Sequence, residues 1–147
     1  MKRSELNEIM RTALARIKEF NFALPPFVTW TMDEWKTKTH EYDEIKEHVW
    51  VAKTATVAPT AYINGPAIIG PEAEVRHCAF IRGNAIVGEG AVVGNSTELK
   101  NVVLFNKVQV PHYNYVGDSI LGYKAHMGAG SITSNVKSDK HLVKVHT

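Results

Sequence analysis

The sequence contains a single cysteine, Cys78, and its 17 basic and 15 acidic residues leave a net charge of only +2. One cysteine excludes an intramolecular disulfide framework and a zinc site built from several thiols, which favours a reducing, cytoplasmic location. The balanced charge gives no argument for nucleic-acid binding, which needs clustered basic surface. No apolar run reaches the roughly 18 residues of a membrane span, and charged residues interrupt the N-terminus where an export signal would lie. We therefore expect a globular protein that binds neither nucleic acid nor membrane.

The first 48 residues have a pattern of their own. Apolar residues recur at steps of three and four between residues 4 and 20, which is the period of an amphipathic helix, and Ser4 is a suitable N-cap. Pro25 and Pro26 require the chain to leave this helix. Residues 31–34 have the spacing of a capping box, which predicts a short second helix. We predict a short α-helical segment over residues 1–48. The apolar residues of the first helix are Leu6, Ile9, Met10, Ala13, Leu14, Ile17 and Phe20.

A strict period of six residues follows Trp50. A large apolar residue stands at every sixth position, and a small residue usually follows it four positions later. Neither a helix nor an alternating sheet has this period, whereas a hexapeptide β-helix does, with the large residue in the core and three hexapeptides in each triangular coil. We predict a mainly β fold, a left-handed parallel β-helix of hexapeptide repeats over residues 49–147. The large residues are Val51, Val57, Ile63, Ile69, Val75, Ile81, Val87, Val93, Leu99 and Phe105, and the small ones run from Ala55 to Ala91.

The stacking rule of such a β-helix predicts one candidate binding site. Residues 18 apart lie one above the other, at about the 4.8 Å spacing of neighbouring strands. Asn64, Arg82 and Lys100 have this spacing and each follows an inward aliphatic residue, so they are predicted to form one outward column. Stacked cations repel unless an anion neutralises them, and a bound phosphate is one such anion. The alternative is a solvated surface ladder without a ligand.

A second candidate lies where we expect the repeat to break. Pro111 stands at a position that should hold an inward aliphatic residue, and the pattern resumes with Val116, Leu121 and Met127. Interruptions of a repeat often carry function. The break places His112 within about one coil of Lys100, which suits a general base beside a phosphate. The alternative is an exposed histidine without a catalytic role.

The residues from about Ile81 to Asn135 resemble the acetyltransferase β-helix of the bifunctional N-acetylglucosamine-1-phosphate uridyltransferase/glucosamine-1-phosphate acetyltransferases and their stand-alone relatives. The resemblance implies acetyl transfer from acetyl-CoA to an amino-sugar 1-phosphate, or a nucleotidyltransferase-associated β-helix acting on UDP-N-acetylglucosamine-type ligands. The matching residues are Ile81-Arg82, Val93-Gly94-Asn95, Glu98-Leu99-Lys100, His112, Tyr115-Val116-Gly117-Asp118, Gly128-Ala129-Gly130-Ser131-Ile132-Thr133 and Asn135.

The same resemblance implies roles for individual residues. His112 corresponds to the general base that deprotonates the amine, and Asn135 to a residue that orients it. The implied substrate-binding residues are Arg82, Lys100 and Tyr115 for the phosphate, Glu98 for the sugar, and His126, which stands where the family usually has asparagine.

The resemblance also implies the ligands and partners. The expected partners are a sugar phosphate or nucleotide sugar and two further copies of the chain in a homotrimer. Acetyl-CoA is the expected co-substrate, and its site is expected to be incomplete because the family's β-helix continues beyond the position of Thr147. No tightly bound metal is expected.

A second resemblance covers the N-terminal part, up to about Lys46, which is similar to the start of the D-lyxose isomerase family. In that family this segment packs on a metal-binding cupin barrel, and no histidine cluster with ligand spacing follows here. We expect a fusion of two fragments without isomerase activity. Two alternatives to acetyl transfer stay open: a non-catalytic β-helix that trimerises or binds sugar nucleotides, and an inactive fusion. The matching residues include Leu24-Pro25-Pro26-Phe27, Trp30, Trp35-Lys36 and Glu41-Tyr42-Asp43-Glu44-Ile45.

Overall fold

The structure, a computed structural model, describes residues 39–133. Both predicted N-terminal helices lie outside this range. The described end of the N-terminal segment consists of a short 3-10 helix, η1 (Thr39–Glu41), and strand β1 (Tyr42–Lys46). Strand β1 pairs antiparallel with β2 (Val49–Ala52). Within residues 39–133, no helix has the length and apolar character needed to cross a membrane.

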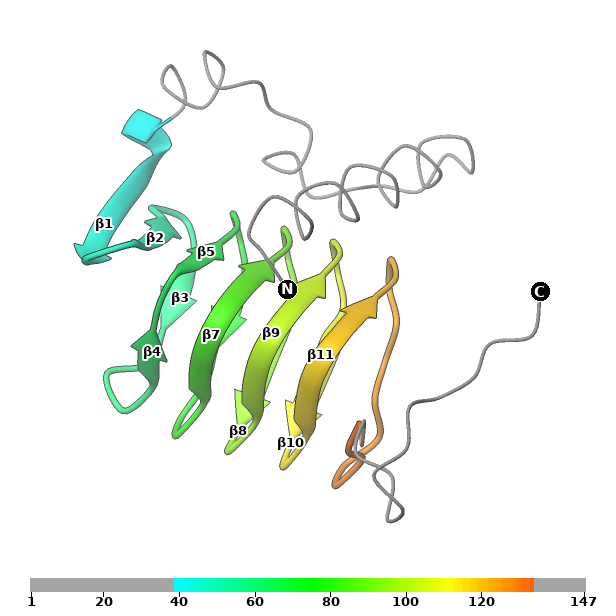
Figure 1. The fold of residues 1–147 in the computed structure, drawn as a ribbon. Helices are drawn as coiled ribbons and strands as arrows, with labels where there is room; N and C mark the ends of the chain where they lie inside the picture. Colours follow the sequence, from blue (N-terminus) through cyan, green and yellow to red (C-terminus); the bar gives the residue numbers. More distant parts are fainter. Residues whose placement is uncertain (1–38, 134–147) are drawn as a thin grey trace, which may run out of the picture.

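Three sides of parallel strands wind around one axis, and Figure 1 shows successive coils following one another along the stack. Side one comprises β4 (Tyr62–Asn64) and the first parts of β7 (Phe80–Val87), β9 (Glu98–Leu104) and β11 (Tyr115–Leu121). Side two comprises β2, β5 (Ala67–Ile69) and the second parts of β7, β9 and β11. Side three comprises β3 (Thr56–Val57), β6 (Glu74–Val75), β8 (Val92–Asn95) and β10 (Gln109–His112). The predicted left-handed parallel β-helix of hexapeptide repeats is confirmed.

Most of the core up to Phe105 consists of residues that the period of six selected. Of the predicted large residues, all except the half-buried Val57 are buried, and five of them have no exposed surface. The alanines at the small phase also pack into this core, because each coil lies directly on the previous one and leaves room for no larger side chain. The five fully buried residues are Ile69, Ile81, Val87, Val93 and Leu99.

The repeat changes register at Asn101, and not at Pro111 as the sequence suggested. Arg82 is in register with Lys100, 18 positions later, whereas Val87 is in register with Leu104, 17 positions later. The single residue Asn101 replaces two residues of the previous coil, so every later coil has 17 residues. The buried Leu104 therefore takes the inward position predicted for Phe105, which is itself buried.

Pro111 lies in strand β10 and is buried, so residues 111–115 are not the interruption loop that we expected. Its backbone packs directly against Gly94 of the previous coil, where any Cβ would overlap the Pro111 carbonyl. This close approach requires glycine at position 94. The other part of the expectation is confirmed, because Val116 is buried and Leu121 and Met127 pack against the core.

Candidate functional site

Side one carries two outward columns of side chains beside the buried Ile81 and Leu99. The register confirms the predicted column, since Asn64, Arg82 and Lys100 are successive partners on β4, β7 and β9. Gly117 of β11 continues this column, which we call the cation column. Two residues before it on each strand lies an aromatic column, consisting of Tyr62, Phe80, Glu98, Tyr115 and Ile132.

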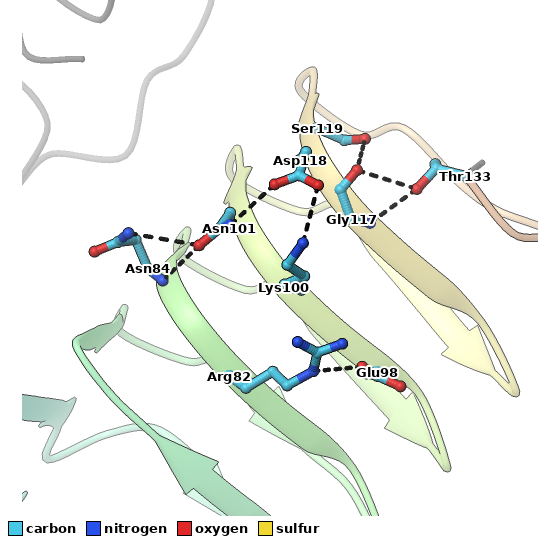
Figure 2. Close-up of polar contacts among 9 residues, drawn as sticks. All are labelled: Arg82, Asn84, Glu98, Lys100, Asn101, Gly117, Asp118, Ser119 and Thr133. Carbon is cyan, nitrogen blue, oxygen red and sulfur yellow. Dashed lines mark hydrogen bonds and ion pairs between the residues drawn. The ribbon is translucent and has the colours of Figure 1, made fainter. Parts of the chain in front are cut away.

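Arg82 reaches from the cation column to the aromatic column. Its Nε donates to Glu98 Oε1 at 2.7 Å (Figure 2), and its guanidinium lies 6.0 Å from the ring centre of Phe80. The two charged side chains are 39% and 34% exposed, so the ion pair is open to solvent on one side. The guanidinium is therefore held beside Glu98 of the next coil, in a position where other anions can approach it.

Lys100 has a different carboxylate partner. Its Nζ lies 3.3 Å from Asp118 Oδ2, one coil further along (Figure 2). The other carboxylate oxygen, Asp118 Oδ1, accepts from Asn101 Nδ2 at 2.9 Å. Beside this pair, the Gly117 amide donates to Thr133 Oγ1 at 2.8 Å. A polar network thus spans three coils at this end of the column and includes Lys100, Asp118 and Thr133.

These contacts change the electrostatic argument made from the sequence. We expected the repulsion between Arg82 and Lys100 to require an external anion, whereas Glu98 and Asp118 already neutralise both cations within the chain. Ion pairs with this exposure are worth only about 0–1 kcal/mol each. A doubly charged phosphate, which can accept several charge-assisted hydrogen bonds at once, has enough interaction energy to compete with them. Both cations of the column are thus neutralised without a ligand.

His112 lies around the corner from these columns. It ends β10 on side three, while Tyr115 starts β11 on side one, and the turn between them contains Tyr113 with φ 51°. The buried Asn114 fixes this corner, because its Oδ1 accepts from the His112 amide at 3.0 Å and its Nδ2 donates to Gly128 O at 2.8 Å. The His112 side chain is exposed. Within residues 39–133, no hydrogen bond joins its ring to Arg82 or Lys100.

The remaining predicted residues fall into two groups. His126 lies on side three, where its Nδ1 is 3.1 Å from Gln109 Oε1, its partner in register. It is therefore on a different side from Arg82, Glu98, Lys100 and Tyr115, which side one brings together. Asn135 lies outside the described residues.

Sequence reasoning gave no role to Asp118 or Asn101. The strict 18-residue rule would have pointed to Asp118, 18 positions after Lys100, although the residue in register with Lys100 is Gly117 and Asp118 lies next to it. The role of Asn101 depends on the register change that it produces, which a strict period of six conceals. Among the described residues, no group of three or more histidine, cysteine, aspartate or glutamate side chains is arranged to hold a metal ion.

The fold and its stacked columns define a hexapeptide-repeat β-helix of the kind found in transferases. The chain belongs to the GMPPB C-terminal domain family, whose model matches residues 63–144, more than half of the chain. The D-lyxose isomerase family model matches residues 1–50, in agreement with the resemblance noted at the N-terminus. This second match extends into β2, the first strand of the β-helix.

Individual relatives match over shorter stretches. The bifunctional protein GlmU of Methanococcus maripaludis strain C5 is 43% identical over 54 residues, which are 37% of this chain and 13% of that protein. The bifunctional sugar-1-phosphate nucleotidylyltransferase/acetyltransferase of Sulfurisphaera tokodaii is 37% identical over 54 residues, 37% of this chain and 14% of that protein. The chain thus spans about an eighth of the length of these relatives.

A solved structure shows the same fold. The acetyltransferase domain of PglB from Neisseria gonorrhoeae superposes with a TM-score of 0.55 at 19% identity, covering 86% of this chain and 51% of that one. At this identity the similarity concerns the β-helix alone.

Proposed function

We propose that side one binds the phosphate of an amino-sugar 1-phosphate and that the chain transfers an acetyl group from acetyl-CoA to the sugar amine. The observation that carries this proposal is the register of Arg82 and Lys100 on adjacent strands, beside Glu98 and Tyr115. Two cationic side chains at one strand spacing match the size of a phosphate, and the phenol and carboxylate beside them supply hydrogen-bonding groups for a sugar.

The phosphate binds by displacing the internal carboxylates. Arg82 turns from Glu98 and Lys100 from Asp118, and both cations then contact the phosphate oxygens. The released Glu98 carboxylate accepts hydrogen bonds from sugar hydroxyls. Because the lost ion pairs are partly exposed, their displacement costs about 1 kcal/mol or less each.

His112 then acts as the general base at the corner between sides three and one. The neutral imidazole removes a proton from the sugar ammonium group, and Asn135 orients the ring. The amine nitrogen attacks the thioester carbonyl of acetyl-CoA, the C–N bond forms, and the C–S bond breaks to release the thiolate of coenzyme A. The proton held by His112 passes to this thiolate, and the second proton, which the nitrogen loses as the amide forms, passes to solvent, so no further reactant is needed.

The names of the relatives support the reaction class. One is called a sugar-1-phosphate nucleotidylyltransferase/acetyltransferase and the PglB structure an acetyltransferase domain. The flat sides of a β-helix also suit assembly with further copies of the chain, and a homotrimer is part of this proposal. His126 contributes to the ligand site from side three.

Titration calorimetry with glucosamine 1-phosphate tests the binding step. The parent chain is compared with the double variant Arg82→Ala/Lys100→Ala and with the matched control Lys53→Ala/Arg76→Ala. The control removes the same charge, and Arg76 also takes part in a half-exposed ion pair, with Glu74 at 2.8 Å. We expect the affinity to fall at least tenfold in the first variant and to be unchanged in the control. Equal affinity in both variants rules out the proposed phosphate site.

A second candidate function is a β-helix that binds nucleotide sugars without catalysis. It is favoured by the internal neutralisation of both cations, which makes the columns stable without substrate. Titration of UDP-N-acetylglucosamine, followed by an acetyl-transfer assay on the same preparation, separates the two functions. Binding without acetyl transfer in the presence of acetyl-CoA selects the second.

A further inference from the structure

Side two carries an outward column made only of apolar side chains. The register stacks these residues on the successive strands β2, β5, β7, β9 and β11, which Figure 1 shows side by side. We call it the apolar column; it consists of Trp50, Ile68, Ile86, Val103 and Ile120. The last of these is 53% exposed, and the others are half-buried.

The other two sides differ from side two in composition. The corresponding column of side three interrupts its polar, exposed residues with one apolar residue, Val92; the polar ones are Thr56, Glu74, Gln109 and His126. Side one combines aromatic rings, at Tyr62, Phe80 and Tyr115, with the charged side chains of Arg82, Glu98 and Lys100. A continuous outward row of branched and aromatic side chains is unusual on a solvated sheet, where outward positions are normally polar. Side two therefore has the character of a covered face.

The chain enters the β-helix at one end of this column. Strand β1 is the outermost strand of side two and pairs with β2, which carries Trp50. Tyr42 of β1 and Ala52 of β2 are buried and form a small cluster, against which Trp50, Ile68 and Ile86 pack. Coverage of the apolar column thus begins with Tyr42, in the last part of the N-terminal segment.

The N-terminal segment has an apolar surface of matching length. Residues 4–20 carry the stripe of apolar residues described above, which requires burial if the segment forms the expected helix. A helix of that length measures about 25 Å at 1.5 Å per residue. The apolar column crosses four strand spacings of about 4.8 Å, or roughly 19 Å. Residues 21–38 are ample to connect the two, at up to about 3.3 Å per residue.

We propose that the amphipathic helix of residues 4–20 docks along the apolar column of the same chain and covers side two. The docked helix buries Ile86, Val103 and Ile120 and leaves side one open to ligands. The N-terminal segment is then an integral layer of the β-helix domain and not a remnant of another fold. This inference is independent of the proposed function, because it concerns a different side of the molecule.

Paramagnetic relaxation tests the contact in the full chain. A nitroxide is attached at Thr12→Cys, which lies off the apolar stripe, in a Cys78→Ser background, and broadening of isoleucine and valine methyl signals is measured. We expect the strongest broadening at Ile86, Val103 and Ile120 on side two. Val92 on side three and Ile132 on side one serve as references and should broaden less.

Mixing chains with different labels shows whether the helix on the apolar column belongs to the same chain or to a second copy. In one sample the nitroxide and the isotope label are on the same chain, diluted with unlabelled chain; in the other they are on different chains. Broadening that survives dilution shows that the helix of the same chain covers the face. Broadening only in the mixed sample assigns the face to a second copy, and equal broadening on all three sides means that the helix is not docked; either result overturns the proposal.

A pair of substitutions checks the energetics. Val103→Glu places a charge in the apolar column, whereas Ile132→Glu places it at an exposed apolar position on side one. Hydrogen exchange of residues 4–20 should accelerate at least tenfold in the first variant and remain unchanged in the second. Unchanged exchange in Val103→Glu contradicts docking on this column.

Discussion

Asn101 donates from Nδ2 to Asp118 Oδ1 at 2.9 Å, and both residues have a positive φ, 51° and 48° respectively. Asn101 Oδ1 also accepts from the Asn84 amide at 3.1 Å in the preceding coil. One side chain therefore connects three coils at the corner where the repeat shortens from 18 to 17 residues. Asparagine and aspartate suit this corner because they tolerate the left-handed conformation better than other side chains.

We expect Asn101→Ala to lower the free energy of unfolding by about 1–3 kcal/mol, because it removes these hydrogen bonds and strains the backbone. Asn101→Gly should lower it less, since glycine adopts positive φ without strain. Urea denaturation of the two variants separates the contributions. Asn84→Ala is the control, because its backbone amide still bonds to Asn101. If Asn101→Ala is as stable as the control, the corner network does not stabilise the fold.

Gly94→Ala should destabilise the chain by more than about 3 kcal/mol, because its Cβ would overlap the Pro111 carbonyl in the next coil. Gly122→Ala is the matched control, since nothing lies within 4 Å of the position of its Cβ. Thermal unfolding of both variants measures the difference. Comparable midpoints would show that the coils can separate locally at Pro111 at little cost.

Burial, together with the carboxylates of Glu41 and Glu89, raises the pKa of Tyr42 to about 12 from its ordinary 10.0. The folded state therefore favours the neutral phenol. This stabilisation is complete below about pH 10 and is lost as the pH rises toward 12, with a total of roughly 3 kcal/mol. Tyr42→Phe should flatten the stability profile between pH 10 and 12. Tyr113→Phe, at a residue that is 63% exposed, should leave the profile as in the parent.

The proposed roles of His112 and the cations predict different kinetic defects. His112→Ala should reduce acetyl transfer at least a hundredfold with little change in the affinity for glucosamine 1-phosphate, because a general base contributes to rate and not to phosphate binding. Arg82→Ala or Lys100→Ala should instead weaken binding about tenfold each. Calorimetry combined with a coenzyme A release assay separates the two effects. A His112→Ala variant with parental turnover would exclude the assigned base.

Much of the fold was predictable because the hexapeptide pattern depends on local packing. Each coil repeats the same requirement for one large inward residue and one small residue, so Ile81 and Leu99 could be placed in the core from spacing alone. The cation column followed from the same rule, since Arg82 and Lys100 lie before the register change.

The rest depended on three-dimensional detail that spacing does not carry. The register change at Asn101 replaces two corner residues by one, and the sequence keeps suitable apolar residues at both Leu104 and Phe105, so the period of six appears intact across it. The pairing of Arg82 with Glu98 depends on rotamers and on the diagonal reach between neighbouring strands. His112 lies on side three because the chain turns after it, at Tyr113. We had expected residues 111–115 to form a loop, and a loop does not predict where the chain turns.

The most direct test of the phosphate site is a crystal structure of the full chain with glucosamine 1-phosphate at a concentration that saturates binding in solution. Our account predicts phosphate density between the Arg82 guanidinium and the Lys100 ammonium group, with both cations turned away from Glu98 and Asp118. Phosphate density at another place, with the Arg82–Glu98 and Lys100–Asp118 ion pairs intact, would contradict it.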